Sequence, residues 1–182
     1  MKLLLGVSGG IAAYKSCEVV SAARKAGHEV RVVMTPNATR FVAPLTFEAL
    51  CGHKVMVDTF ADALDHIAWA KWAEVVLVAP ASANVLGKLA CGLADDALGT
   101  TLMAVPRGRP VLLAPAMNTE MWLHPVVQRN LRWLEALDRY TILAPVEKRL
   151  ACGDYGPGGL PDPGELLAAA EAALQAGAPR PA

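Results

Sequence analysis

Short apolar runs recur along the chain and alternate with longer stretches whose apolar residues follow helical spacing. The run Val75-Val76-Leu77-Val78-Ala79 contains no polar residue, which is typical of a parallel strand buried on both faces. We expect Pro80 to end this strand and Ser82 to cap a helix over residues 83–91. Other strands are predicted at 2–7, 29–34, 54–57, 110–114 and 140–144.

The stretches between these strands predict helices, some with recognisable ends. Gly27 and Gly52 stand where glycine ends a helix, and Asp162 with Pro163 begins a last helix that stops before Gly177. The other helices are expected at 11–26, 46–51, 65–73, 83–91, from Asp95 or Asp96 to 105, and 126–137, with a Gly-rich loop over 146–161. This alternation predicts an α/β fold: a three-layer, doubly wound parallel sheet, Rossmann-like or flavodoxin-like. Residues 1–177 form one domain and 178–182 a tail.

Composition narrows the classes of protein that fit. Of the 182 residues, 54% are hydrophobic and 5% aromatic, so the core is mostly Ala, Val and Leu, and a buried subunit interface is expected. Seventeen basic residues balance seventeen acidic ones without a basic block, which argues against nucleic acid as a partner. The longest apolar runs are far shorter than the roughly 20 residues of a membrane span. We therefore expect a cytosolic protein with no membrane partner. Four cysteines without a C-x-x-C motif predict neither a metal site nor a disulfide framework.

The turn after the first predicted strand is a candidate ligand site. Its glycines, Gly9 and Gly10, would let a phosphate or ring approach the backbone at a helix start. The turn is not G-x-G-x-x-G, and the second strand ends at Met34 without an acidic residue for a ribose. These features favour a mononucleotide such as FMN over NAD and disfavour an NAD-dependent dehydrogenase. A tight turn without ligand is the alternative, and Thr35 and Asn37 fit either cofactor contacts or turn chemistry.

Three side chains are candidates for catalysis. His66 precedes the central strand and could take a proton near neutral pH, or it could be structural. Asn118 follows the strand at 110–114 and could bind a carboxylate or amide, or cap a helix. Cys152 lies in the Gly-rich loop, which could act as a lid that carries a proton-donating thiol, or it could be incidental. The sequence neighbours of the other histidines, His28, His53 and His124, give no stronger indication of a catalytic role.

Motifs along nearly the whole chain resemble those of the flavin-containing cysteine decarboxylases. Pro80-Ala81-Ser82-Ala83-Asn84 with Gly92-Leu93-Ala94-Asp95-Asp96 is similar to the family's flavin-binding segment. Residues 115–122 match its P-x-M-N-x-x-M-W motif, and Ala151-Cys152-Gly153-Asp154 resembles its substrate-recognition flap. His66 stands where the family has its catalytic histidine.

The resemblance implies an FMN enzyme that needs no metal. His66 starts the oxidation of a C-terminal cysteine to a thioaldehyde, Asn118 binds its carboxylate, and Cys152 donates the proton when the enethiolate left by decarboxylation is reduced. The implied cofactor contacts are Ser8, Gly9, Gly10, Ile11, Thr35, Asn37, Phe41, Ser82, Ala83, Asn84 and Ala116. The implied substrate contacts are Asn118, Met117, Met121, Ala151 and Gly153. The most similar members convert 4′-phosphopantothenoylcysteine to 4′-phosphopantetheine in coenzyme A synthesis, and members are trimers or dodecamers with sites between subunits.

The chain departs from the family pattern at two positions. Val85 stands where a threonine is frequent, and Gly159-Leu160 replaces Gly-Arg-Met, so a positive charge near the substrate is expected to be missing. Three alternatives share this fold: decarboxylation of a peptide's C-terminal cysteine, flavin prenylation, and a flavin-binding regulatory subunit without catalysis. Flavin prenylation is disfavoured because the Asn118 motif and the flap would have no purpose in it. A ligase that makes the substrate is expected on a separate protein or on a part not included in this chain.

Overall fold

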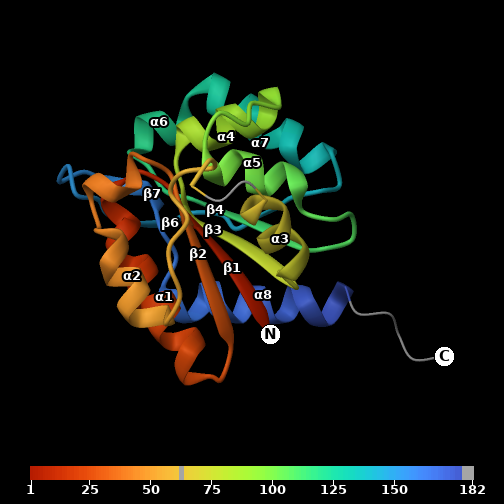
Figure 1. The fold of residues 1–182 in the computed structure, drawn as a ribbon. Coiled ribbons are helices and arrows are strands. Elements are labelled where there is room, and N and C mark those ends of the chain that lie inside the picture. The colour runs from red at the N-terminus through yellow and green to blue at the C-terminus, as the bar shows by residue number, and fades with distance from the viewer. Residues whose placement is uncertain (62–63, 178–182) are drawn as a thin grey trace.

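The computed structural model describes residues 1–61 and 64–177 (Figure 1). The main strands are β1 (Lys2–Val7), β2 (Glu29–Met34), β3 (Val75–Ala81), β4 (Val111–Pro115) and β5 (Thr141–Ile142), followed by the hairpin strands β6 (Val146–Arg149) and β7 (Tyr155–Gly159). The helices are α1 (Lys15–Lys25), α2 (Pro44–Cys51), α3 (Asp65–Trp72), α4 (Ala83–Cys91), α5 (Ala97–Ala104), α6 (Thr119–Leu123), α7 (Pro125–Ala136) and α8 (Pro163–Gly177). Two 3-10 turns are η1 (Ile11–Tyr14) and η2 (Ala38–Arg40).

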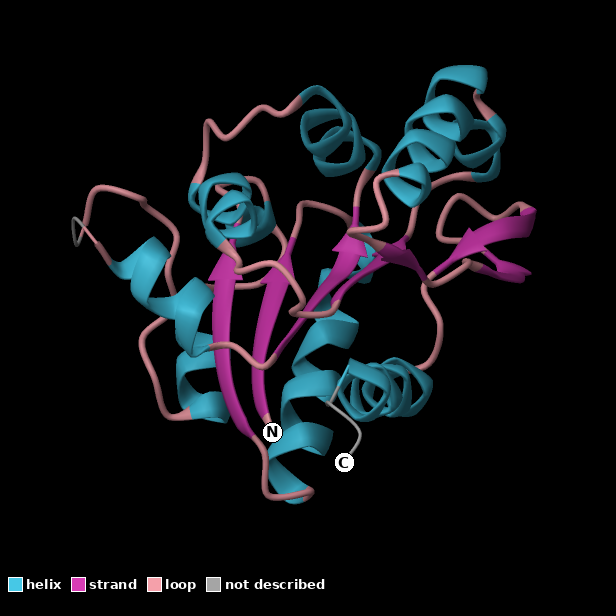
Figure 2. Cartoon of the chain, turned by 90° about the vertical axis from the view of Figure 1, so that its right-hand side faces the viewer, coloured by secondary structure: helices cyan, strands magenta, loops and turns pink. Residues whose placement is uncertain are grey.

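The five main strands form one parallel sheet in the order β2-β1-β3-β4-β5. This order confirms the doubly wound α/β fold. The order in which the chain adds strands changes direction between β1 and β3, so the connections that follow these two strands lead to opposite faces of the sheet. Figure 2 shows the strand arrows ending at a common edge, with the separate β6–β7 hairpin beside it. In open α/β sheets, ligands bind at such a reversal, beyond the carboxyl ends of the strands.

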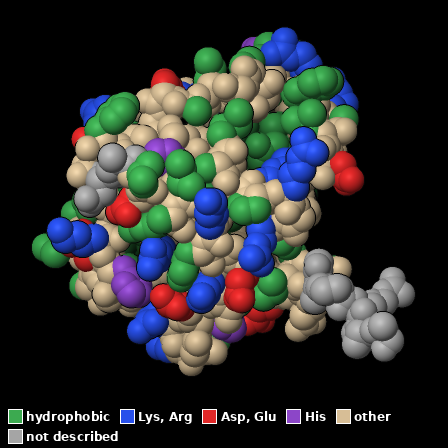
Figure 3. All heavy atoms as spheres, turned by 45° about the vertical axis from the view of Figure 1, so that its right-hand side comes forward, with side chains coloured by type: hydrophobic (Ala, Val, Ile, Leu, Met, Phe, Trp, Pro, Cys, Tyr) green, Lys and Arg blue, Asp and Glu red, His purple; other side chains and the backbone are tan. Residues whose placement is uncertain are grey.

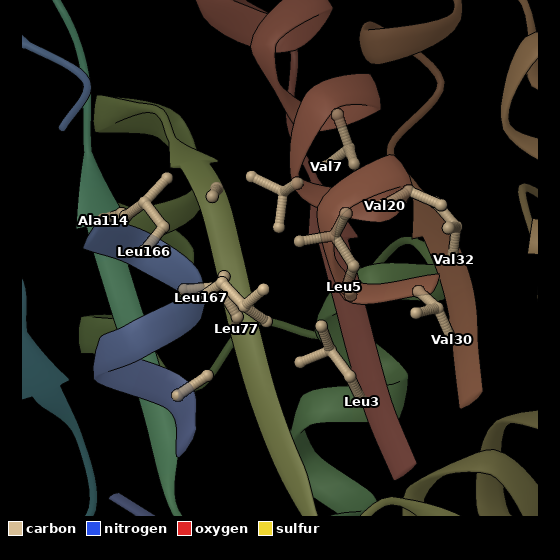
Figure 4. Close-up of a cluster of buried hydrophobic side chains, with 14 of the residues drawn as sticks. Leu3, Leu5, Val7, Val20, Val30, Val32, Leu77, Ala114, Leu166 and Leu167 are labelled. Carbon is tan, nitrogen blue, oxygen red and sulfur yellow. The ribbon is translucent and has the colours of Figure 1, made fainter. Parts of the chain in front are cut away.

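Helices cover both faces of the sheet and produce two apolar cores. On one face, α1, α2 and α8 pack against alternate strand residues; Figure 4 shows Leu166 and Leu167 of α8 beside Leu77 and Ala114. On the other face, α3, α4, α5 and α7 pack against the remaining strand residues, such as Val76. All seven residues of β3 are buried, which is why its sequence reads as a continuous apolar run.

Several boundaries differ from the sequence predictions. The prediction that Pro80 ends the central strand is wrong, because β3 continues to Ala81 with a shift of register between Val78 and Ala81. Proline is tolerated within a sheet at such irregularities, because no regular ladder hydrogen bond is lost there. The expected strand at 54–57 is only an isolated bridge between Val33 and Met56.

The segment at 146–161 also differs from expectation, because it contains the antiparallel β6–β7 hairpin rather than loop alone. Glycine and proline in β7 hid this strand from propensity arguments. The last helix reaches Gly177, one residue further than predicted, and the expected tail, 178–182, lies outside the described residues. At its start, the Asp162 N–H donates to Glu165 (3.2 Å).

Within the described ranges, no helix has the length and apolar character needed to cross a bilayer. On the face that Figure 3 shows, basic and acidic side chains are interspersed with hydrophobic ones.

Candidate active site

The buried hydroxyl of Ser8 ties together the loops that follow β1 and β3. It donates to the Pro80 carbonyl (2.8 Å) and accepts from the Ser82 N–H (2.9 Å). Ser82 in turn caps α4, as predicted, by accepting from the Val85 N–H (3.5 Å). The Ser8 side chain therefore fixes the two loops at the reversal of the sheet, and the backbone around it is what faces outward.

Gly9 and Gly10 lie on opposite sides of the turn after β1, one packed against the protein and the other open. A Cβ on Gly9 would lie 2.6 Å from Cβ of Asn37, so only glycine lets the turn pack against the segment after β2. A Cβ on Gly10 would meet nothing within 4 Å, so this residue borders open space. The first turn of η1 also has no side-chain cap. The turn thus presents uncapped backbone N–H groups beside an opening.

That opening is part of a pocket of about 710 Å³ at the carboxyl edge of the sheet. Its wall joins the β1 turn, the start of α4, the segment after β4, and the β6–β7 hairpin. The sequence-predicted residues that line it are Gly9, Gly10, Ile11, Ser82, Ala83, Ala116, Met117, Asn118, Met121, Ala151 and Cys152. Segments far apart in the sequence therefore form one site.

Asn118 and Cys152 are in direct contact across this pocket. The Asn118 Oδ1 atom accepts from the Glu120 N–H (2.9 Å) and so caps α6, while its Nδ2 donates to Cys152 Sγ (3.4 Å). The Cys152 thiol donates to Oδ2 of Asp154 (3.2 Å). The capping role considered for Asn118 is therefore present and fixes the amide, while its role as a carboxylate ligand stays a prediction.

The hairpin is held against the segment after β4 by close backbone contacts. The Met117 N–H donates to the Gly158 carbonyl (2.9 Å), and the Thr119 hydroxyl donates to the Pro157 carbonyl (2.9 Å). A Cβ on Gly156 would come within 2.8 Å of the Thr119 Oγ1, so a side chain there would force the two apart. The glycines of β7 allow this approach and thereby place the segment 150–154 over the pocket.

Other expected contacts lie outside the pocket lining, namely Ser8, Thr35, Asn37, Phe41, Asn84 and Gly153. Thr35 accepts from the Ala38 N–H (3.2 Å), which is the turn role that was its alternative. Phe41 is half exposed, and Asn84 is exposed on α4. Within this single chain, these side chains do not line the pocket, although Ser8 and Asn37 lie directly behind Ser82 and Gly9, which do.

His66 also lies apart from Asn118 and Cys152. It belongs to α3, which Figure 1 places on the right of the sheet, whereas α6 and β7 lie on the left. Its Nδ1 atom is buried and has no hydrogen-bond partner in the described part of the chain. One chain alone therefore does not bring the three catalytic candidates together.

The acidic pair in the flavin-like segment has a structural role. Lys88 of α4 contacts Asp95 (2.6 Å) and Asp96 (2.8 Å), and these contacts raise the pKa of Lys88 and lower the pKa of Asp95. Asp96 also accepts from the Gly99 N–H (2.8 Å) and caps α5. This cluster joins α4 to α5 and does not line the pocket.

Sequence reasoning missed the basic residues of the pocket: Lys15, Lys148 and Arg149. The expectation of a missing positive charge concerned the flap, where residue 159 is glycine; the pocket wall nevertheless includes these three basic side chains. Lys15 begins α1 five residues after Gly10, a position that signals proximity to the turn. Lys148 gave no such signal because its strand was not predicted. Over residues 1–61 and 64–177, no group of three metal-binding side chains was found.

Comparisons with known proteins agree with this geometry. A family model described as Flavoprotein matches residues 1–175. The coenzyme A biosynthesis bifunctional protein CoaBC of Bacillus subtilis is 50% identical over 173 residues, which are 93% of this chain and 42% of that protein. CoaBC of Mycobacterium tuberculosis (strain H37Rv) is 46% identical over 176 residues, 96% of this chain and 41% of that protein. The chain thus spans about two fifths of the length of these relatives.

Two solved structures share the fold over nearly their whole length. A mutant PPC decarboxylase complexed with pantothenoylaminoethenethiol has a TM-score of 0.82 at 34% identity, covering 94% of this chain and 96% of that one. The FMN-dependent cysteine decarboxylase SpaF has a TM-score of 0.82 at 36% identity, covering 98% of both chains. With the family match over residues 1–175, these likenesses establish that the chain belongs to the flavoprotein family.

Proposed function

We propose that this chain is an FMN-dependent carboxy-lyase that converts 4′-phosphopantothenoylcysteine to 4′-phosphopantetheine. The observation that carries this proposal is the contact between Asn118 and Cys152 on a pocket that also reaches Gly9, Gly10 and the start of α4. The Asn118 amide, the Cys152 thiol and the open glycine turn thereby share one space. The CoaBC relatives and the PPC decarboxylase neighbour support the choice of substrate.

The pocket residues fit FMN. The open space beside Gly10 and the apolar residues Ile11, Ala83 and Ala116 accommodate a ring, and the uncapped turn offers N–H donors to polar atoms. FMN supplies two-electron oxidation and reduction when bound. The family match and the FMN-binding neighbours AtHal3 and SpaF support this cofactor. The expected contacts from Ser8, Thr35, Asn37, Phe41 and Asn84 belong to this proposal.

Side chains of this chain are proposed to bind the cysteine end of the substrate and to donate a proton to it. The cap at α6 occupies the Asn118 oxygen and Cys152 Sγ accepts from one N–H, so the other N–H is the donor proposed to bind the substrate carboxylate. Met117, Met121, Ala151 and Gly153 are the proposed neighbours of the substrate. The Cys152 thiol is the proposed proton donor, and its contact with Asn118 supports this role because the same amide is the proposed carboxylate ligand.

His66 is the proposed base, and we infer that a second copy of the chain brings it to the pocket. In one chain His66 does not line the pocket, and its Nδ1 has no partner among the described residues. Large apolar side chains are exposed around the turn and α2: Ile11 (61%), Tyr14 (54%), Phe41 (50%) and Leu45 (71%). Such a surface favours a subunit interface. We propose a homotrimer, alone or as part of a dodecamer.

The remaining expectations are part of the same proposal. The domain comprises residues 1–177. All four cysteines are unpaired, which suits a reducing compartment and the proposed cytoplasmic location. A phosphopantothenate–cysteine ligase, on another protein or another segment, would supply the substrate. Nucleic acid and membrane are not proposed as partners.

Release of carbon dioxide by FMN-loaded protein tests the proposal. Phosphopantothenoylcysteine and a peptide ending in cysteine are compared at equal concentration. We expect release from the first and little from the second. Preference for the peptide would assign the alternative of a peptide decarboxylase, and a flavin-loaded protein inactive on both would favour the regulatory alternative.

A further inference from the structure

The basic residues of the pocket gather at the hairpin side. Lys15, Lys148 and Arg149 contribute to its wall, and among the described residues the wall contains no Asp or Glu. The chain as a whole is electrically balanced, with seventeen basic and seventeen acidic residues. A cavity lined by one sign of charge attracts ligands of the opposite sign.

Lys148 is held inside the pocket by two features of the hairpin. Its aliphatic stem covers Gly159 so closely that a Cβ on Gly159 would lie 2.1 Å from its Cε and 2.7 Å from its Cγ. Its ammonium donates to the Leu160 carbonyl. Gly159 therefore provides the space in which the lysine lies, and the side chain is aimed along the wall instead of into solvent.

The charges of Lys148 and Lys15 are poorly compensated. Lys15 Nζ lies 3.6 Å from a carboxylate oxygen of Asp162, whose side chain is 77% exposed. In the described part of the chain, no carboxylate lies within ion-pair distance of Lys148. Burial, and then the neighbouring Lys15, lower the pKa of Lys148, and the more distant carboxylates of Asp162 and Glu165 offset this only in part. Two ammonium groups held together in this way are stabilised when a dianion binds between them.

We propose that Lys148 and Lys15 form a phosphate-binding subsite at the hairpin end of the pocket. Its ligand is a phosphate monoester, carried either by the substrate or by the flavin. The assignment to a substrate phosphate rests on the proposed function, whereas the phosphate-binding chemistry does not. A site for the substrate phosphate would distinguish phosphopantothenoylcysteine from a cysteine-terminated peptide.

Calorimetric titration with inorganic phosphate tests the subsite without turnover. Apoprotein and FMN-loaded protein are each prepared as wild type, Lys148→Met and Lys148→Arg, with Lys25→Met as a control on an exposed part of α1. Lys148→Met keeps the stem over Gly159 and removes only the charge. We expect its phosphate affinity to fall about 10-fold or more, Lys148→Arg to retain binding, and Lys25→Met to match the wild type.

Two further comparisons identify the source of the phosphate. If it belongs to the substrate, Lys148→Met lowers kcat/KM for phosphopantothenoylcysteine but not for its dephosphorylated form. If it belongs to the flavin, FMN-loaded protein no longer binds phosphate, and Lys148→Met weakens FMN but not riboflavin. Equal phosphate affinity in wild type and Lys148→Met would overturn the subsite. A wild type that binds phosphate but turns over neither substrate would contradict the proposed function alone.

Discussion

The side-chain amide of Asn118 donates a hydrogen bond to the Sγ atom of Cys152, 3.4 Å away, although 34 residues separate the two in the sequence. Two separate features bring these side chains together. The α6 cap orients the Asn118 amide, and the glycines of β7 allow the hairpin to pack against the segment after β4. The proposed carboxylate-binding group and the proposed acid are thereby adjacent. This adjacency leads to the first two predictions.

Asn118→Asp is predicted to abolish substrate binding while the fold persists. Aspartate also caps helices, so α6 is kept, but its negative charge replaces the donor N–H groups and repels a carboxylate. Asn118→Ser, which keeps a cap without a charge, serves as the matched control. We expect KM for Asn118→Asp to rise well above that for Asn118→Ser. Unchanged KM and kcat in Asn118→Asp would remove this residue from the site.

Cys152→Ser is predicted to separate the two halves of the reaction. A serine hydroxyl is a much weaker acid than a thiol, so carbon dioxide is still released but the enethiol is not reduced. Mass spectrometry of the products, with Cys91→Ser as control because Cys91 is also exposed, measures the ratio of unreduced to reduced product. If Cys152→Ser made only the normal product, Cys152 would not be the acid.

His66→Asn is predicted to keep the flavin and lose turnover by about 10²–10⁴-fold, the range for removal of a general base. Because His66 lies apart from Cys152 in one chain, co-expression of His66→Asn with Cys152→Ser tests the subunit arrangement. Mixed assemblies contain sites with both native groups, and random assembly restores about a quarter of the wild-type rate of phosphopantetheine formation. Full turnover by His66→Asn alone would exclude His66 as the base. If the co-expressed variants recovered no turnover, His66 and Cys152 of one site would belong to the same chain.

Gly159→Ala is predicted to displace Lys148 from the pocket. A Cβ there would lie 2.1 Å from Cε of Lys148, and the flexible lysine side chain is the part that yields. We expect the phosphate affinity of Gly159→Ala to approach that of Lys148→Met, with little loss of Tm. Gly164→Ala is the control, because a Cβ on Gly164 meets nothing within 4 Å. Wild-type phosphate affinity in Gly159→Ala would show that the position of Lys148 does not matter.

Ser8→Ala is predicted to lower the free energy of unfolding by about 1–3 kcal/mol, because the buried Pro80 carbonyl and Ser82 N–H lose their hydroxyl partner. Denaturant unfolding of the apoprotein measures the change. Ser21→Ala, at a half-buried position of α1, is the comparison and should differ little from wild type. A neutral Ser8→Ala would mean that the hydroxyl does not hold the two loops together.

The fold was predictable because its strands are buried on both faces. Residues 2–7 and 29–34 were predicted with the observed bounds, and so was the helix at 83–91, since apolar runs and a capping Ser82 leave few alternatives. The hairpin was not predicted, because it depends on contacts between distant segments, such as Met117 with Gly158, which no local pattern contains. A helix capped by Asn118 was only one of two readings of that residue, although its cap is local.

The candidate site residues were identified from the sequence and their roles stay predictions, but how they group in space was not predicted. Asn118 and Cys152 were identified from their motifs, and the structure joins them. The same motifs gave no indication that His66 lies apart in one chain or that Lys148 enters the pocket. Both facts depend on how α3 and β6 are placed in space, and the absence of a side chain at Gly159 is what makes room for the lysine.

The central claim is the loss of carbon dioxide from a phosphorylated cysteine conjugate. FMN-loaded wild-type protein is incubated with phosphopantothenoylcysteine, and the products are identified by mass spectrometry, with Cys152→Ser in parallel. The account predicts phosphopantetheine from the wild type and the unreduced enethiol from Cys152→Ser. Unchanged substrate with flavin-loaded wild-type protein would contradict it.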